Sequence, residues 1–223
     1  MNLAKGRSIF LSLSGEKAYE TIKSRILNHV YVPSQTLVES ALAEELGVSR
    51  NTVKRALMML VNEKLVELEA NKSARVKSLT LEEAVYLLEI RERLEGLIAY
   101  SAAKVITEKE LSILRNNLGE MKGFLAENKL LEYSGINDMI HQVLYDICPN
   151  REAIELIQSI RLQLRRYNKR TVLITGRSNQ SLEEHTALFH ALEAGDPDEA
   201  ERVMRIHIHN VRTTLRDNYH ILF

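Results

Sequence analysis

The spacing of hydrophobic residues predicts a chain that is helical almost throughout. Apolar residues recur three or four positions apart over most of the sequence, which is typical of amphipathic helices. A first helix is expected over 15–30, after a partly ordered tail over 1–13. Residues 65–68 and 75–77 instead predict two short strands around a polar loop. After these strands the pattern predicts six helices, at 81–106, 108–126, 130–147, 150–173, 181–194 and 197–217.

Local motifs mark where several of these helices begin. A Ser or Thr followed three residues later by Glu is a capping box, which satisfies free N–H groups at a helix start. Capping boxes are found at Thr80–Glu83, Thr107–Glu110 and Ser181–Glu184. Asp196-Pro197 predicts another start, with Asp as N-cap and Pro in the first turn.

The segment 41–60, ALAEELGVSRNTVKRALMML, predicts a helix-turn-helix. Gly47 supplies the turn and Ser49 is placed to cap the second helix. One face of that helix is apolar: Val53, Leu57, Leu60 and Val61. The opposite face carries hydrogen-bonding and basic residues: Arg50, Asn51, Lys54 and Arg55. Such a face favours insertion into the DNA major groove, although an ordinary amphipathic hairpin has the same pattern.

A helix-turn-helix followed by a β-hairpin is a winged helix. Lys72 and Arg75 on the hairpin are candidates for contact with phosphate or the minor groove, or are simply solvated. We therefore predict a winged helix-turn-helix DNA-binding domain over 1–78 and an all-helical domain over 79–223.

The balance of positive and negative residues also differs between the two predicted domains. Through Leu79 the chain has 12 Lys and Arg against 8 Asp and Glu, whereas the whole chain has 30 of each. The excess of positive charge in the first part favours a polyanionic partner there.

Cys148 is the only cysteine, so no intrachain disulfide is possible and a reducing compartment fits. No apolar run approaches 18 residues, so we expect a cytoplasmic protein without a membrane span.

Four side chains of the helical part form a candidate metal site. Asn137 and His141 share one helix face because they are four residues apart, and His185 and His207 lie on two later helices. Neutral imidazoles suit Zn²⁺ or Ni²⁺, with Mn²⁺ as a further option. Packed or surface histidines are the alternative, and we assign that role to the other four: His29, His190, His209 and His220.

Arg91 is a candidate effector-binding residue. It lies beside the inward-facing residues Leu88 and Leu94, where a guanidinium could hold a ligand carboxylate. An ion pair with Glu92 or Glu95 is the alternative.

These motifs together resemble the GntR family of bacterial transcription regulators, in particular its FadR-like branch with an FCD ligand-binding domain. The resemblance spans about 15–215. LAEELGVSRNTVKRAL is similar to the family's LA-x-x-LGVSR-x-PVREAL, and EIRERLE to its ELR-x-x-LE. The third match is EEHTALFHALEAGDPDEAERVMRIH, with its EH pair, its GD turn and its final-helix His. The resemblance implies a winged helix-turn-helix joined to an FCD bundle of six (or seven) helices.

The resemblance also implies roles for these residues. Arg50 and Lys54 stand where the family contacts bases and phosphates, with Ser49 and Thr52 nearby. Arg91 stands where many members help to bind an effector carboxylate. The residues that stand at the metal-binding positions of FCD proteins are Asn137, His141, His185 and His207.

The sequence departs from the family pattern at several positions. The family's PGE is Pro33-Ser34-Gln35 here, and Arg55 replaces the Glu of its PVRE. Ser73 replaces the glycine of the wing, and Ile140 replaces a Phe beside the metal-helix His. These changes bear on the operator sequence and on the shape of the effector pocket.

We therefore expect a homodimeric regulator, and a repressor, that binds a pseudo-palindromic double-stranded DNA operator. Its helical domain is expected to bind a divalent metal and a small carboxylate. One alternative is a metal-dependent enzyme fused to a DNA-binding domain, but we find no suitably spaced general base or nucleophile and expect no enzyme activity. The other is a regulator whose metal is purely structural.

Overall fold

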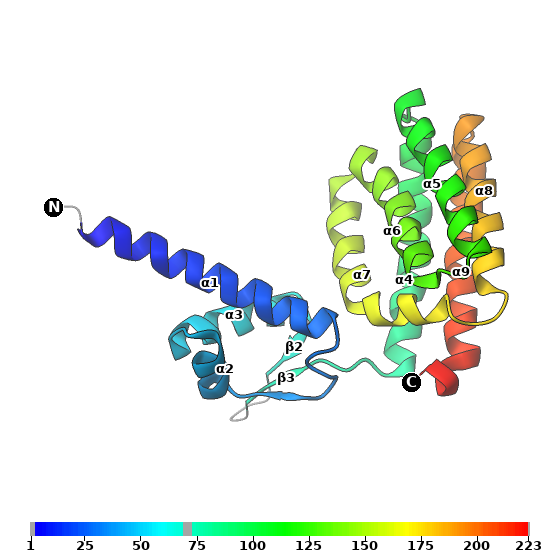
Figure 1. Ribbon diagram of the computed structural model, residues 1–223. Helices are drawn as coiled ribbons and strands as arrows, with labels where there is room; N and C mark the ends of the chain where they lie inside the picture. Colours follow the sequence, from blue (N-terminus) through cyan, green and yellow to red (C-terminus); the bar gives the residue numbers. More distant parts are fainter. Residues whose placement is uncertain (1–2, 69–72, 223) are drawn as a thin grey trace. The chain divides into compact units, whose positions relative to one another are not determined.

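The computed structural model describes residues 3–68 and 73–222, and its parts form two compact units, Met1–Leu79 and Thr80–Phe223 (Figure 1). Side chains are described from residue 15 onward, except at 166, 168 and 169. Each unit has its own hydrophobic core, and we consider the two separately.

The first unit is a winged helix. Its elements are α1 (Leu3–Leu27), β1 (Thr36–Leu37), α2 (Glu39–Leu46), α3 (Arg50–Asn62), β2 (Val66–Glu67) and β3 (Ala74–Val76). The strands form an antiparallel sheet in the order β1-β3-β2. Helix α1 packs on α3, and Ile22 of α1 and Val53 and Leu60 of α3 are fully buried.

The turn between α2 and α3 forms as predicted. Gly47 takes a φ of +64°, and its N–H donates to carbonyls of the last turn of α2. The Ser49 Oγ accepts a hydrogen bond of 3.1 Å from the N–H of Thr52 and so caps α3. These local bonds fix the direction in which α3 leaves the turn.

Two expectations about element boundaries are wrong, and one strand was not predicted. Helix α1 begins at Leu3, so the tail expected over 1–13 is largely helical backbone. Strand β1 was not expected, because two residues are too few to produce a periodic pattern. Helix α8 begins at Arg177 after Gly176, which has a φ of +83°, so Ser181 lies inside the helix and does not cap it.

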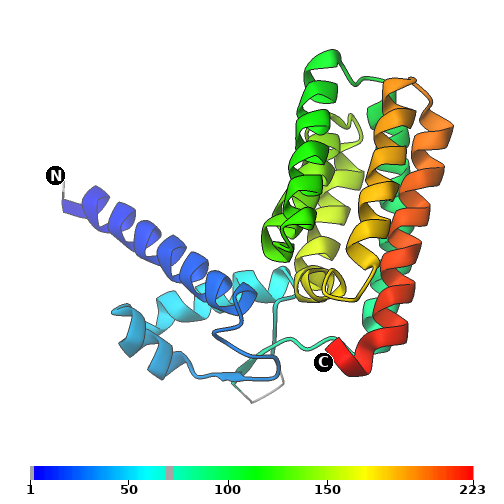
Figure 2. The same ribbon diagram turned by 45° about the vertical axis from the view of Figure 1, so that its right-hand side comes forward.

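The second unit is a six-helix bundle over the part of 80–223 that the structure describes. Its helices are α4 (Leu81–Ala103), α5 (Glu108–Ala126), α6 (Leu130–Ile147), α7 (Arg151–Thr171), α8 (Arg177–Glu193) and α9 (Pro197–Leu222). Helix α4 packs most extensively on α9, while α5 lies against α6 and α8 (Figure 2). Gly96 permits the close approach of α9, because a Cβ there would lie 2.6 Å from Cγ of Arg205.

Three of the predicted helix starts are formed in this unit, at Thr80, Thr107 and Asp196. At the start of α5 the N–H of Thr107 donates to Oε2 of Glu110 at 3.1 Å. The N–H of Thr80 donates to Oε2 of Glu83 at 2.8 Å, and the N–H of Glu83 donates to Oγ1 of Thr80 at 3.1 Å. The N–H of Glu199 donates to Oδ1 of Asp196 at 3.0 Å, which caps α9. All three motifs are local, and this explains why the sequence predicts them well.

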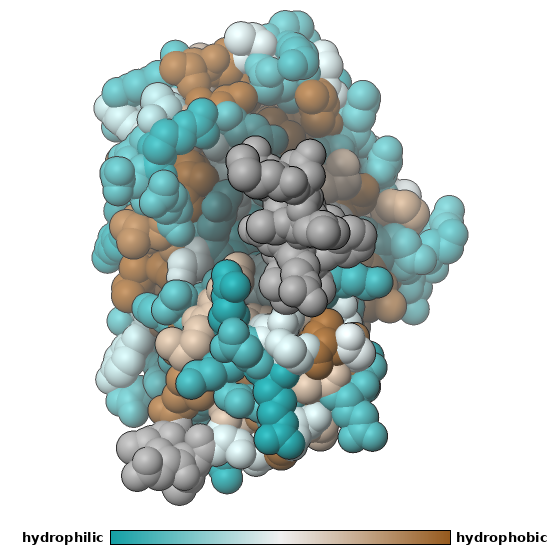
Figure 3. Space-filling view, turned by 90° about the vertical axis from the view of Figure 1, so that its left-hand side faces the viewer, coloured by the Kyte–Doolittle hydropathy of each residue, from teal (hydrophilic) through white to brown (hydrophobic). Residues whose placement is uncertain are grey.

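No described helix is both long and apolar enough to span a bilayer. On the face drawn in Figure 3, hydrophobic residues lie in separate small groups among hydrophilic ones. Scattered exposed apolar residues of this kind are normal for a protein surface.

We predict that Ser34→Gly stabilises the protein. Ser34 is exposed and has a φ of +63°, a conformation that strains any residue with a Cβ. Relief of this strain, less the extra entropy of glycine in the unfolded chain, should raise the free energy of unfolding by about 0.5–1 kcal/mol. Urea titration measures the change. Ser24→Gly, inside α1, is the control and should lower stability, and a Ser34→Gly protein no more stable than wild type would contradict the prediction.

Candidate metal centre and nucleic-acid interface

Three buried histidines converge inside the bundle from three different helices. His141 lies on α6, His185 on α8 and His207 on α9. One ring nitrogen of each lies within 4.8 Å of those of the other two. The ring centroids of His185 and His207 are 4.4 Å apart, and each is 5.4 Å from that of His141. The structure thus brings together the three histidines that the sequence analysis selected.

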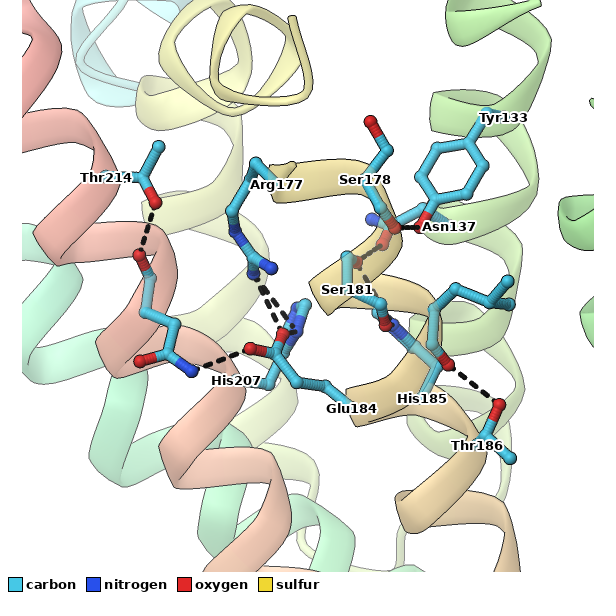
Figure 4. Close-up of polar contacts among 12 residues, drawn as sticks. Tyr133, Asn137, Arg177, Ser178, Ser181, Glu184, His185, Thr186, His207 and Thr214 are labelled. Atoms are coloured by element: carbon cyan, nitrogen blue, oxygen red, sulfur yellow. Dashed lines mark hydrogen bonds and ion pairs between the residues drawn. The ribbon is translucent and has the colours of Figure 1, made fainter. Parts of the chain in front are cut away.

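Each of these imidazoles is held through Nδ1 by an acceptor of the protein. Nδ1 of His141 donates to Oε2 of Glu95 at 3.1 Å, and Nδ1 of His207 to Oε2 of Glu184 at 2.6 Å. Nδ1 of His185 donates to the carbonyl of Ser181 at 2.7 Å (Figure 4). This pattern places the proton on Nδ1 and leaves Nε2 as a lone-pair donor.

The second ring nitrogens of His141 and His185 are unusual. Both Nε2 atoms are buried without a hydrogen-bond partner in the described part of the chain. Buried polar atoms nearly always have a partner, so two such atoms in one cluster need a physical explanation. An imidazole with an anchored Nδ1 and a free Nε2 is the usual arrangement of a histidine that binds a metal.

Burial keeps the three imidazoles neutral. It lowers the pKa of His141, although the nearby Glu95 opposes this shift. Burial and the neighbouring histidines lower the pKa of His185 well below its ordinary value of 6.5. The pKa of His207 is also well below 6.5, because of burial first and of His141 and Arg177 second. Neutral imidazole is the form that binds a cation.

A buried carboxylate network supports His141. Glu95 on α4 is fully buried, and Oε1 accepts a hydrogen bond of 3.0 Å from Nε of Arg91. The hydroxyl of Tyr145 also donates to Oε1, and Arg161 donates to that hydroxyl at 2.8 Å. Burial alone would raise the pKa of Glu95, but His141 and the two arginines hold it well below 4.5. The carboxylate is therefore charged and fixes the ring of His141.

A small cavity of about 40 Å³ lies beside the histidines. His207 contributes to its wall, and so do Asn137, Ser181 and two arginines, Arg91 and Arg177. Asn137 is half-buried, and its Oδ1 accepts a hydrogen bond of 3.5 Å from Oγ of Ser181. Of the four predicted metal ligands, Asn137 and His207 thus line this cavity.

Arg91 forms one of the ion pairs that the sequence left open. Its side chain is buried and bound to Glu95, and it also lines the cavity. Its role toward an effector stays a prediction.

Sequence reasoning missed Glu184 and Arg177 as residues of the site, and it named Glu95 only as a partner of Arg91 and not of His141. Glu184 accepts hydrogen bonds from His207, Arg177 and Asn210, the last at 2.7 Å (Figure 4). The signal that could have found Glu184 is its position directly before His185 in the EH pair. Arg177 had no such signal, because it lies outside the helix expected from Ser181.

The remaining histidines lie away from the cluster. His29, His190, His209 and His220 are exposed. His190 has Glu193 as a neighbour, at 3.6 Å, and His209 has Glu92, at 3.7 Å.

In the first unit the basic face of α3 is open to solvent. Arg50, Asn51, Lys54 and Arg55 are all exposed, whereas Thr52 is buried and bonded to Ser49. Ser49 and Thr52 therefore shape the start of α3, and the four exposed residues offer the groups that can reach a partner. Arg75 is half-buried on β3, and Lys72 lies outside the described residues.

We predict that the metal-free protein loses stability as the pH falls below 6.5. The pKa of His185 is lowered by folding, so below 6.5 the unfolded chain binds a proton that the folded chain does not. The free energy of unfolding should then fall by up to about 1.4 kcal/mol per pH unit for this histidine. Urea titrations between pH 7.5 and about 5 in the presence of a chelator measure the slope.

His185→Gln should reduce that slope, because it removes the group that takes up the proton. His190→Gln is the matched control, since His190 is exposed on the same helix. An unchanged slope in His185→Gln would show that the His185 imidazole is not responsible.

Comparisons with known proteins agree with this architecture. Residues 14–76 match the family described as bacterial regulatory proteins, gntR family, and residues 86–210 match the FCD domain. The HTH-type transcriptional repressor RspR of Escherichia coli is 23% identical over 90% of this chain and 88% of its own. The HTH-type transcriptional regulator LutR of Bacillus subtilis is 29% identical over 78% of this chain and 88% of its own.

The fold is also that of a solved structure. The E. coli protein McbR/YncC has a TM-score of 0.75 and 17% identity, and covers 92% of this chain and 98% of its own. The FCD match covers more than half of the chain, and the match to the gntR family precedes it. The chain is therefore a DNA-binding transcription regulator of the GntR family, with an FCD domain as its helical unit.

Proposed function

We propose that this regulator is a metal-dependent repressor that responds to a small carboxylate. The observation that carries the proposal is the pair of buried Nε2 atoms, on His141 and His185, that have no partner among the described residues. A buried nitrogen without a partner costs about 1–3 kcal/mol. A metal ion bound between the rings would remove that cost for both.

His141, His185, His207 and Asn137 would hold the ion. Three imidazoles suit Zn²⁺ or Ni²⁺, with Mn²⁺ as a further option, and the amide oxygen of Asn137 is a weaker ligand. All four ligands are neutral, so the bound ion would supply a concentrated positive charge and open coordination positions. The carboxylate–histidine bonds of Glu95 and Glu184 support this assignment, because metal-bound histidines usually have such partners.

A small carboxylate effector fits the same place. The cavity lies against His207 and Asn137, and Arg91 forms part of its wall. A guanidinium beside a metal gives a carboxylate two sources of positive charge. Effector binding must favour either the DNA-binding or the non-binding arrangement, and a coupling of about 1–3 kcal/mol would change operator affinity roughly 5- to 150-fold.

The first unit would bind a pseudo-palindromic operator as part of a homodimer. Arg50, Asn51, Lys54 and Arg55 on α3 would enter the major groove, and Lys72 and Arg75 on the hairpin would contact the backbone or minor groove. RspR, which is similar over most of the chain, is named a repressor, and this supports repression here. A protein that regulates a bacterial chromosome acts in the cytoplasm.

We predict about one divalent metal ion per chain in wild-type protein purified without a His-tag, and almost none in His141→Ala. Because the metal binds only the folded state, its loss should also lower the melting temperature. Elemental analysis and thermal unfolding measure both effects, and His190→Ala is the control that should keep the metal. Full metal content in His141→Ala would remove His141 from the site, and an empty wild type after addition of Zn²⁺, Ni²⁺ and Mn²⁺ would refute the metal proposal.

We predict that Arg50→Ala weakens specific DNA binding by about 1–3 kcal/mol, because a bidentate contact from Arg to a base is lost. The probe is a DNA fragment selected from a random pool by the wild-type protein, and binding is measured at fixed salt concentration. Lys122→Ala, on the exposed surface of α5, is the control and should bind as wild type does. Equal affinity of Arg50→Ala and wild type would show that Arg50 reads no base.

A further inference from the structure

We propose that two residues of α3 read bases of the operator: Asn51 an adenine, and Met58 a thymine about three base pairs away in the same half-site. This inference rests on the proposed function, because it takes α3 as the element that enters the major groove. It goes further in that it assigns two specificity-determining residues and names the base that each of them selects.

Asn51 and Met58 lie on the side of α3 opposite to its buried face. An α-helix turns by about 100° per residue, so the buried residues of α3 occupy one arc around the helix axis. These residues are Thr52, Val53, Ala56, Leu57 and Leu60. The direction opposite to the middle of that arc passes between Asn51 and Met58, within about 10° of each. Both are exposed, Met58 with 44% of its surface, so they face a partner most directly.

Cations lie on both sides of this line. Lys54 is about 50° to one side of it and Arg55 about 50° to the other. Both side chains are exposed, and neither has an acidic partner among the residues that the structure describes. A helix in the major groove has a phosphate backbone on each side and the edges of the bases in front of it. The two cations therefore fit the two backbones, and the uncharged line between them fits the bases.

The side-chain amide of Asn51 is free to make a base contact. It forms no hydrogen bond within the part of the chain that the structure describes. An amide has a donor and an acceptor side by side, and these match the N7 acceptor and the N6 donor that adenine presents in the major groove. A phosphate binds a cation more strongly than a neutral amide. Adenine is therefore the group that Asn51 fits best.

Met58 presents an apolar surface on the same line, two helical turns after Asn51. The apolar group in the major groove is the 5-methyl group of thymine, and the flexible methionine side chain adapts well to such a contact. Seven residues of helix span about 10.5 Å, or about three base-pair steps. Met59 is exposed to a similar extent, 47%, but it lies about 100° away around the helix. The two methionines therefore differ in direction and not in accessibility.

The experiment measures binding of the full-length protein, at fixed salt concentration, to a DNA duplex that the wild type selects from a random pool. Each thymine in turn is replaced by uracil, which lacks only the 5-methyl group. Each adenine in turn is replaced by 7-deazaadenine, which lacks only the N7 acceptor. In wild type we expect one sensitive thymine and one sensitive adenine per half-site. The loss of affinity should be about fourfold for the methyl group and about fivefold for the hydrogen bond.

Variants of the two residues connect each loss to one side chain. In Met58→Ala the uracil replacement should cause no further loss, and in Asn51→Ala the deazaadenine replacement should cause none. Met59→Ala is the matched control for the methionine. Asn116→Ala, at an exposed asparagine of α5, is the matched control for the asparagine, and both controls should keep both sensitivities.

The outcomes separate this inference from the function on which it rests. A wild type that selects a sequence but has no sensitive thymine or adenine would overturn the inference and leave operator binding intact. A thymine that stays sensitive in Met58→Ala, or an adenine that stays sensitive in Asn51→Ala, would overturn the assignment of that residue. A wild type that selects no sequence from the pool would refute the proposed operator binding and this inference with it.

Discussion

The structure of the helical unit depends on one requirement, that three buried imidazoles each keep an acceptor at Nδ1. Glu95 and Glu184 meet it for His141 and His207, and a backbone carbonyl of α8 meets it for His185. Buried carboxylates need cations in turn, and Arg91 and Arg177 supply them. These directional bonds therefore join α4 to α6 and α8 to α9. The same requirement places two guanidinium groups at the cavity, because the buried carboxylates that serve as acceptors need counter-charges.

Much of the fold could be predicted from the sequence, because its determinants are local. Gly47, Ser49 and the Thr80–Glu83 box act within a few residues of their own position, and all three behave as the sequence indicates. The errors arise where local signals compete or are too short. Ser181 and Glu184 have the spacing of a capping box, but Gly176 starts the helix earlier, and the box residues instead hold His185 and His207.

The residues of the candidate site were likewise only partly predictable from the sequence. The convergence of His141, His185 and His207 follows from a resemblance to a known family, whose motif order carries information on tertiary contacts. The contact between Glu95 and His141 is not predictable from the sequence, because the two residues are 46 positions apart and lie on different helices. Arg177 pairs with Glu184, but it lies before the helix start that the sequence predicts. Spacing along one helix gave Arg91 two possible roles, and only the structure shows that its Nε is already bound to Glu95.

Regulation requires that the cavity affect the DNA-binding unit, and the covalent structure indicates which element connects them. Strand β3 of the winged helix ends at Val76, and Thr80 caps α4 shortly afterwards. The same helix α4 carries Arg91 and Glu95, and it packs along α9, which carries His207. A ligand that draws on the charge of Arg91 or Arg177 must rebalance the ion pairs of Glu95 and Glu184. Since Glu95 is part of α4, a change in that balance would act on the helix that directly follows the wing, and we therefore propose α4 as the element that would couple the two sites.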